Sequence, residues 1–203
     1  MKSKDLLRKG LLAISLTAYL IALVLIFYFI PKSLARADLE LIIKNAIVYV
    51  KQGQVNYGLP VRLRMPSIDT DAIVEHLGIT PDGIMDTPKN IDNVAWFNLG
   101  PRPGEIGSAV IAGHYGWKNG KASIFINLYK LKKGDKLYVE DDKGVAISFI
   151  VRETRKYDQK ADASGVFSSS DGRSRLNLIT CEGDWDKVSK SYPERLVVFT
   201  EKE

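Results

Sequence analysis

The second two-thirds of the chain alternates short apolar runs with turn-forming residues, which is typical of β structure. Pro, Gly, Asp and Ser separate the runs, as they do in the turn Thr80-Pro81-Asp82-Gly83. The predicted strands span residues 61–65, 72–79, 108–112, 136–140, 145–153, 176–180 and 196–200. Residues 123–131 favour a short helical segment instead. Seven or eight short strands with little helix predict a mostly β fold, a closed barrel or a sandwich, over residues 61–203.

An uninterrupted apolar run from Leu11 to Ile30 predicts a transmembrane helix ahead of the β domain. Its twenty residues carry no charge. A helix of that length rises roughly 30 Å, which is the thickness of the hydrocarbon core of a bilayer. A cleaved secretory signal is the alternative, because the triplet Ala35-Arg36-Ala37 resembles a cleavage site. The apolar run of such a signal is usually shorter, so we expect an uncleaved membrane anchor.

The basic residues gather at the membrane end of the chain. Residues 1–36 hold six basic side chains and one acidic side chain, which accounts for the whole net charge of +5 (6 − 1 = 5). The rest of the chain holds 23 basic and 23 acidic side chains (29 − 6 and 24 − 1) and is neutral. This distribution argues against a nucleic-acid-binding face, so we expect no nucleic-acid partner.

The same charges predict the topology. Four of the basic residues precede the apolar run, so the positive-inside rule places the N-terminus in the cytoplasm and the β domain outside. The predicted protein is a single-pass protein of the cell membrane. Its parts are a basic cytoplasmic segment (1–10), the anchor (11–30), a stalk or linker (31–60) and an extracytoplasmic β domain (61–203).

Cys181 is the only cysteine of the chain. Outside the membrane a lone thiol cannot form an intrachain disulfide, and it is exposed to oxidation. It is therefore either buried and inert or retained for its reactivity, and its own surroundings leave both readings open. Cys181 directly follows the predicted strand 176–180 and precedes a loop, which is a suitable position for a nucleophile that must be both rigid and accessible.

A reactive thiol needs a base or a cation beside it. Of the two histidines, His114 directly follows a predicted strand and has Gly113 and Gly116 close by, whereas His76 lies within a strand between apolar residues. His114 is therefore the better candidate for proton transfer. Arg195 opens the last predicted strand, and its permanently charged guanidinium suits an oxyanion or a peptide carbonyl. Most arginines are ordinary surface residues, so this position is suggestive rather than decisive.

The sequence contains no pattern for a metal or a cofactor. The aspartates lie scattered in turns without the spacing of a calcium loop, and one Cys with two separate His does not form a zinc cluster. Neither a phosphate-binding glycine motif nor a dinucleotide fingerprint is present. We therefore expect an active site without metal or cofactor.

Three segments match a known family in order and spacing. Gly107 to His114 (GSAVIAGH) is similar to a strand that leads to a histidine, and Leu178 to Cys181 (LITC) is similar to the signature Thr-Leu-X-Thr-Cys. Asn177 stands in the place of the first Thr of that signature. Arg195 to Val198 (RLVV) is similar to a last strand that begins with an arginine. Together these segments resemble the sortases, a family of cysteine transpeptidases, and the compact domain is closest in appearance to classes D, E and F.

The resemblance implies an eight-stranded sortase β-barrel and a two-step acyl transfer. Cys181 would attack the Thr carbonyl of a C-terminal Leu-Pro-X-Thr-Gly-like sorting signal and form a thioester. An amine acceptor, commonly a peptidoglycan precursor, would then release it. His114 would protonate the leaving amine and deprotonate the incoming one, while Arg195 would hold the substrate backbone and the oxyanion. The implied partners are secreted proteins that carry the signal, together with the amine acceptor.

The resemblance also suggests which residues surround the substrate. The loop at residues 157–175 would be the specificity loop over the groove. The candidate substrate-binding residues are Thr180, Ile179, Tyr115 and Trp117.

Two other classes of function compete with this prediction. A different thiol enzyme, such as a hydrolase or an L,D-transpeptidase, would also use Cys and His. An L,D-transpeptidase normally has a His-Gly-Cys cluster, which residues 178–183 lack. A non-catalytic anchored barrel that binds a wall polymer or a protein is the third possibility, but it leaves the lone thiol unexplained.

Overall fold

The structure, a computed structural model, describes residues 40–44 and 55–203. No helix within those ranges has the length and apolar character needed to cross a membrane. The predicted anchor at residues 11–30 lies outside the described residues. Residues 40–44, within the predicted stalk, are helical and exposed.

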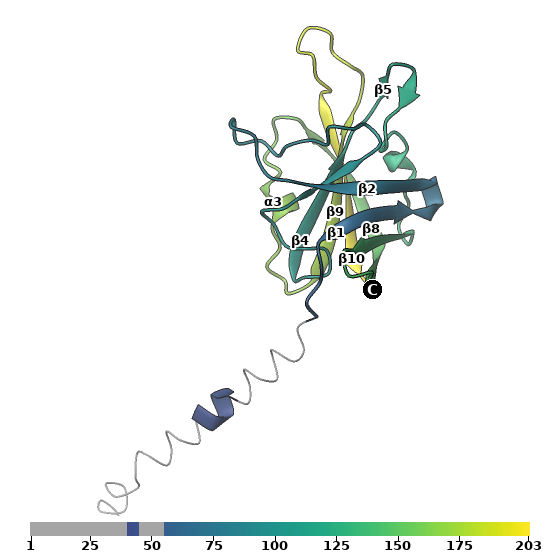
Figure 1. The fold of residues 1–203 in the computed structure, drawn as a ribbon. Coiled ribbons are helices and arrows are strands. Elements are labelled where there is room, and N and C mark those ends of the chain that lie inside the picture. The colour runs from purple at the N-terminus through teal and green to yellow at the C-terminus, as the bar shows by residue number, and fades with distance from the viewer. Residues whose placement is uncertain (1–39, 45–54) are drawn as a thin grey trace, which may run out of the picture. The chain divides into compact units, whose positions relative to one another are not determined.

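Over residues 55–203, eight strands form a closed barrel in the order β1-β2-β3-β4-β9-β10-β8-β7 (Figure 1). Two neighbouring pairs are parallel, β2 with β3 and β4 with β9, and the others are antiparallel. The prediction of a mostly β, eight-stranded barrel is confirmed. The strands are β1 (Pro60–Met65), β2 (Thr70–Leu77), β3 (Val94–Phe97), β4 (Gly107–Gly113), β7 (Lys136–Asp141), β8 (Ala146–Asp158), β9 (Ser174–Glu182) and β10 (Glu194–Lys202).

The remaining elements are short and lie in the connections. A two-stranded sheet, β5 (Trp117–Lys118) with β6 (Lys121–Ala122), follows β4. Figure 1 shows it at the same end of the barrel as the loop that leads into β10. The helical elements are η1 (Pro66–Ile68), η2 (Leu128–Lys130) and α3 (Ser164–Phe167).

The alternation of side chains along the strands separates the barrel interior from its outer face. On β9, Leu176 and Leu178 are fully buried in the main hydrophobic core. Successive side chains of a strand point to opposite faces, so Asn177, Ile179 and Cys181 share the outer face. The outer face of this part of the barrel is therefore the surface on which the candidate nucleophile lies.

All seven predicted strands occur, but several are longer than the pattern predicted, and one is missing from the prediction. β3 was not predicted, because its apolar run of four residues, Val94–Phe97, is shorter than any other strand of the barrel. The predicted loop at residues 157–175 is shorter than expected. β8 continues through Asp158, because its last residues pair with the start of β10, and β9 already begins at Ser174.

The barrel unit begins before the predicted border at residue 61, since the compact unit spans Asn56–Glu203. Tyr57 is buried in the main core. Gly58 donates its backbone N–H to the buried Asp141 carboxylate at 2.7 Å. Burial raises the pKa of Asp141, but hydrogen bonds from the backbone N–H groups of Val145, Gly58 and Lys143 outweigh it and lower the pKa. Asp141 thus joins the β7–β8 turn to the start of the barrel.

Helix α3 is attached to the outer face of β9 by a buried amide. Asn177 donates from Nδ2 to the backbone oxygen of Val166 at 2.6 Å, and Asn177 is almost fully buried. Val166 packs with Val110 and Val197 in a second, smaller hydrophobic cluster. Asn177 therefore has a structural reason to occupy a position where the sortase signature has Thr.

We expect Asn177→Ala to lower the free energy of unfolding by about 1–2 kcal/mol, because the Val166 carbonyl loses its partner in a buried place. Thermal unfolding followed by circular dichroism measures this as a decrease in Tm of roughly 2–8 °C. The exposed Asn98 makes no side-chain hydrogen bond to the described residues, so Asn98→Ala is the control and should leave Tm unchanged. Equal Tm values for the two variants would show that the amide does not hold α3.

Candidate active site

Cys181 and Arg195 are direct partners across the β9–β10 pair. Side chains of directly opposite residues in an antiparallel pair lie on the same face of the sheet. This face also carries Ile179 and Val197, one alternation step away on each strand. The pairing of β9 with β10 therefore brings the two candidate residues together, and it is longer than the pairing of β9 with β4.

His114 lies at the corresponding end of the strand on the other side of β9. The parallel pairing of β4 with β9 ends at Ala112 opposite Ile179. His114 and Cys181 each come two residues after that last pair, so they occupy equivalent positions along the two strands. Thr180 donates its hydroxyl to the backbone oxygen of Gly113 at 2.8 Å. This hydrogen bond joins β9 and β4 one residue before Cys181 and His114. The three candidate catalytic residues thus come from three adjacent strands at one end of the barrel.

The imidazole of His114 is held by a backbone carbonyl from the β2–β3 connection. Its Nε2 lies 2.7 Å from the oxygen of Pro88. A carbonyl oxygen only accepts hydrogen bonds, so this contact requires the proton to be on Nε2. In the neutral ring, Nδ1 is then the nitrogen that can accept a proton. The bond to Pro88 therefore selects the tautomer and the orientation of the ring.

The surroundings of Cys181 favour the neutral thiol at rest. The side chain is a free thiol of intermediate exposure. Burial raises its pKa above the ordinary cysteine value, and the positive charge of Arg195 acts in the opposite direction. A neutral thiol must lose its proton in order to react, so a proton acceptor such as the imidazole of His114 is needed nearby.

The guanidinium of Arg195 is held by its own chain segment. Its Nη1 donates to the backbone oxygens of Tyr192 and Glu194, each at 2.9 Å. Among the described residues, its Nε and Nη2 groups have no hydrogen-bond partner and it forms no ion pair. Part of the fork of donors is therefore free to bind a carbonyl or an oxyanion.

A pocket of about 650 Å³ opens on the outer face beside Cys181 and Arg195. That volume is in the range of small-ligand and peptide side-chain sites. Its walls come from α3 and the β8–β9 loop, from residues 79–87, and from the outer faces of β4, β9 and β10. Most of the lining is apolar, and includes Ile79, Ile84, Phe97, Val166, Phe167 and Val197. We call this the first pocket.

A second pocket of about 700 Å³ contains His114. It is walled by the β4–β5 connection and the loop that follows Cys181, and it is lined in part by Tyr115, Trp117, Asp184, Trp185 and Tyr192. Burial, together with the nearby Cys181, raises the pKa of Tyr192. Only the negatively charged thiolate of Cys181 exerts this second effect, and Cys181 itself lines the first pocket.

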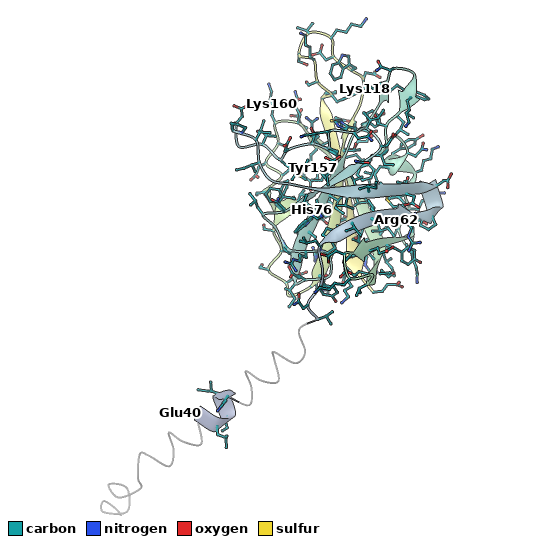
Figure 2. All side chains as sticks on the ribbon, in the orientation of Figure 1. Glu40, Arg62, His76, Lys118, Tyr157 and Lys160 are labelled. Atoms are coloured by element: carbon teal, nitrogen blue, oxygen red, sulfur yellow. The ribbon has the colours of Figure 1, made fainter. Side chains whose placement is uncertain are left out.

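The structure divides the predicted substrate-binding residues between the two pockets. Ile179 and Thr180 line the first pocket, although the Thr180 hydroxyl is already bonded to Gly113. Tyr115 and Trp117 line the second pocket. The other histidine, His76, lies on β2 with its Nε2 2.7 Å from the oxygen of Pro60, and it lines neither pocket (Figure 2).

Several lining residues were not singled out from the sequence. Val166 and Phe167 were overlooked, although two apolar residues inside a polar loop are a usable signal of burial. Tyr192, in the loop between Cys181 and Arg195, was also overlooked. Within residues 40–44 and 55–203, no three His, Cys, Asp or Glu side chains are grouped so that they could hold a metal ion.

Comparisons with known proteins agree with this geometry. The family model described as "Sortase domain" matches residues 63–203, which is more than half of the chain. No curated protein gives a match. Among solved structures, sortase C-1 of Actinomyces oris is 26% identical, with a TM-score of 0.56, over 70% of this chain and 72% of its own.

Two sortases A share the fold at lower identity. The lid mutant of the Corynebacterium diphtheriae enzyme is 20% identical, with a TM-score of 0.56, over 74% of this chain and 73% of its own. The Listeria monocytogenes enzyme is 22% identical, with a TM-score of 0.55, over 73% of this chain and 88% of its own. These neighbours are of classes A and C, so the likeness to classes D, E and F stays a prediction. The chain belongs to the sortase family and is a cysteine transpeptidase.

Proposed function

We propose that this sortase cleaves a C-terminal Leu-Pro-X-Thr-Gly-like sorting signal after Thr and transfers the acyl group to an amine acceptor of the cell wall. In this proposal Cys181 is the nucleophile, His114 the proton carrier and Arg195 the oxyanion-binding cation. The observation that carries the proposal is the strand register. On β9, Cys181 lies opposite Arg195 of β10, and it is level with His114, which follows β4 on the other side.

The sorting signal would bind in the first pocket. The apolar lining suits the Leu and Pro side chains, which lose water-exposed apolar surface on binding. Phe97 and Phe167 meet edge to face in this lining, with ring centroids 5.5 Å apart, and form a firm apolar wall. The scissile Thr carbonyl would then lie over Cys181, within reach of the free donors of Arg195.

In the acylation step, Sγ of Cys181 forms a bond to the Thr carbonyl carbon while its proton passes to Nδ1 of His114. The negative charge that develops on the carbonyl oxygen is stabilised by Arg195. The carbon–nitrogen bond then breaks, and the leaving amine takes the proton from His114. The products are a thioester and the free C-terminal part of the signal.

In the second step, the acceptor amine attacks the thioester carbon and gives a proton to His114. The carbon–sulfur bond breaks, and the thiolate recovers the proton to regenerate the neutral thiol. One histidine thus serves as base and acid in turn, and because the hydrogen bond to Pro88 occupies Nε2, Nδ1 would carry the transferred proton in both steps.

The proposed location is the outer face of the cell membrane. The apolar run at residues 11–30 would anchor the chain with its N-terminus in the cytoplasm, and secreted proteins that carry the signal would meet the barrel outside. Fractionation of cells that express the full chain tests this, because an alkaline carbonate wash should leave the protein in the membrane fraction. Release of the protein by that wash would contradict the anchor.

We expect Cys181→Ala to abolish both the thioester and the transfer of a sorting-signal peptide to an amine, because the nucleophile is lost. Intact-mass spectrometry of the full chain with donor peptide should show an acyl adduct for the wild type only. Peptide release without an adduct on the wild type would favour a hydrolase without a covalent intermediate. Full transfer by Cys181→Ala would favour a different nucleophile.

We expect His114→Ala to lower kcat/KM for the donor by roughly 10²–10⁴-fold, since proton transfer is lost. The matched control is His76→Ala, which removes the other histidine of the chain from a strand that lines neither pocket. It should keep its transfer activity within about twofold of the wild type. A similar loss in both variants would show that the effect is structural.

The pH dependence of Cys181 alkylation reports on the electrostatics of the site. Only the thiolate reacts with iodoacetamide, and burial raises the pKa of Cys181. We therefore expect the alkylation rate to rise with pH through a midpoint above that of a free cysteine. Arg195→Gln removes the charge that lowers this pKa, so alkylation at neutral pH should become about three- to tenfold slower.

Arg195→Lys keeps a positive charge but not the planar fork of donors. It should alkylate at nearly the wild-type rate while transferring poorly. Faster alkylation in Arg195→Gln would show that the guanidinium does not stabilise the thiolate.

A further inference from the structure

The second pocket adjoins a third pocket of about 350 Å³ that is rich in lysine. The two share Ile91 and Lys118 in their linings, so they lie next to each other. We call this surface, the second pocket plus the lysine-lined pocket, the His114 groove. Figure 2 shows Lys118 at the end of the barrel where β5 lies.

The middle of the His114 groove is aromatic and partly open to solvent. Tyr192 meets Tyr115 and Trp185 edge to face, with ring centroids 5.2 and 5.0 Å apart. Trp117 and Trp185 are 70% and 50% exposed, which is unusual for side chains of this size. Exposed rings arranged as a wall are suited to contact with the body of a ligand.

Gly116 makes the close packing of this wall possible. Its φ is +86°, and a Cβ at this position would lie 2.2 Å from the Tyr192 hydroxyl oxygen. Only glycine fits both the backbone conformation and the space. The loop that follows Cys181 is thereby brought against the β4–β5 connection.

The charges of the groove differ at its two ends. Asp184 lines the second pocket, three residues after Cys181. Burial comes first among the causes that raise the pKa of Tyr115, and the carboxylates of Glu182 and Asp184 add to it, although Glu182 is paired with Lys156. The carboxylate of Asp184 gives this end of the groove a negative charge. A negative potential near the thioester attracts a positively charged amine.

The other end of the groove is basic. Lys89, Lys118 and Lys121 line the third pocket, and Lys121 is paired with Asp92. Within the described part of the chain, neither Lys89 nor Lys118 forms an ion pair. Glu75 accepts a hydrogen bond from the backbone N–H of Lys89, but the ammonium groups of Lys89 and Lys118 stay outside any ion pair of the described residues and are suited to a ligand that brings an anionic group.

We propose that the His114 groove binds the acceptor substrate, and that this acceptor carries an amine at one end and an anionic group, a phosphate or a carboxylate, at the other. This inference rests on the proposed function, since it assigns the amine acceptor of the same reaction. Asp184 attracts the ammonium group to the end near Cys181, where His114 accepts its proton. The aromatic wall contacts the body of the acceptor, and Lys89 and Lys118 bind the anion.

The first experiment measures acceptor preference in the full-length chain with a saturating sorting-signal peptide. The acceptors are 6-aminohexanol, 6-aminohexanoate and 6-aminohexyl phosphate, which share the amine and the alkyl chain and differ in the terminal group. We expect a KM for an anionic acceptor about three- to tenfold below that of the alcohol, with the difference shrinking as salt is added. Improvement by the phosphate alone identifies a phosphate site, and equal improvement by both identifies a general anion site. Equal KM values for all three acceptors would overturn the inference.

The second arm tests the lysines. The double variant Lys89→Gln/Lys118→Gln should lose the preference for the anionic acceptors and keep the wild-type KM for 6-aminohexanol. Its thioester formation and hydrolysis should also stay unchanged. The matched control is Lys132→Gln/Lys133→Gln, which removes two exposed lysines of the turn before β7 that line none of these pockets and should keep the preference. A preference retained by the Lys89/Lys118 double variant, or lost equally in the control, contradicts the inference.

A binding measurement separates this inference from the proposed function. Two of the three tryptophans, Trp117 and Trp185, line the groove, so their fluorescence can report ligand binding without turnover. Cys181→Ala should bind 6-aminohexyl phosphate or 6-aminohexanoate more tightly than 6-aminohexanol. If Cys181→Ala prefers the anionic ligands but the wild-type chain forms no thioester, the groove proposal stands and the proposed function is wrong. If the wild-type chain forms a thioester but no variant prefers the anionic ligands, the proposed function stands and the groove proposal is wrong.

Discussion

The active site depends on the hydrogen-bonded position of β9 between β4 and β10. β9 is parallel to β4 and antiparallel to β10, so the end of β4, the end of β9 and the beginning of β10 all lie at one end of the barrel. Because register in a sheet is fixed along the whole strand, a slip of one residue would move Cys181 to the inner face and away from Arg195. Leu176 and Leu178 of β9 are buried in the core, and a slip of one residue would move both side chains out of it, so their packing prevents the slip. Core packing thus sets the geometry of the proposed catalytic residues.

This arrangement places opposing demands on Cys181. The outer face of β9 is covered by α3 and neighbouring loops, and that cover creates an apolar pocket but also raises the pKa of the thiol. The cation that offsets this effect, Arg195, is held by two backbone carbonyls instead of a carboxylate. A carboxylate partner would neutralise the guanidinium and remove its effect on the thiol. Backbone carbonyls orient the group while its full positive charge stays available.

The sequence was informative where side chains carry the signal. Short apolar runs predicted seven of the eight barrel strands, and strand ends followed by loops indicated His114 and Cys181, whereas Arg195 depended on the resemblance to the sortases. β3 gave too short a signal, because it has only four residues, Val94–Phe97. The bond between His114 and Pro88 could not be predicted either, since its acceptor is a backbone carbonyl and any residue type supplies one. The two pockets could not be predicted either. They form where loops that are far apart in the sequence meet, and no pattern in a single sequence predicts such contacts.

In the proposed reaction, the two pockets give the two substrates separate approaches to one carbon atom. The first pocket is apolar and lies on the Arg195 side, while the second is aromatic and charged and lies on the His114 side. A donor that stays bound as a thioester need not leave before an acceptor arrives, because the two do not compete for the same surface. Transfer competes with hydrolysis, so the enzyme gains from an acceptor held beside the thioester at a high effective concentration. A polar groove that ends at the proton-carrying histidine serves that requirement better than an enlarged donor pocket would.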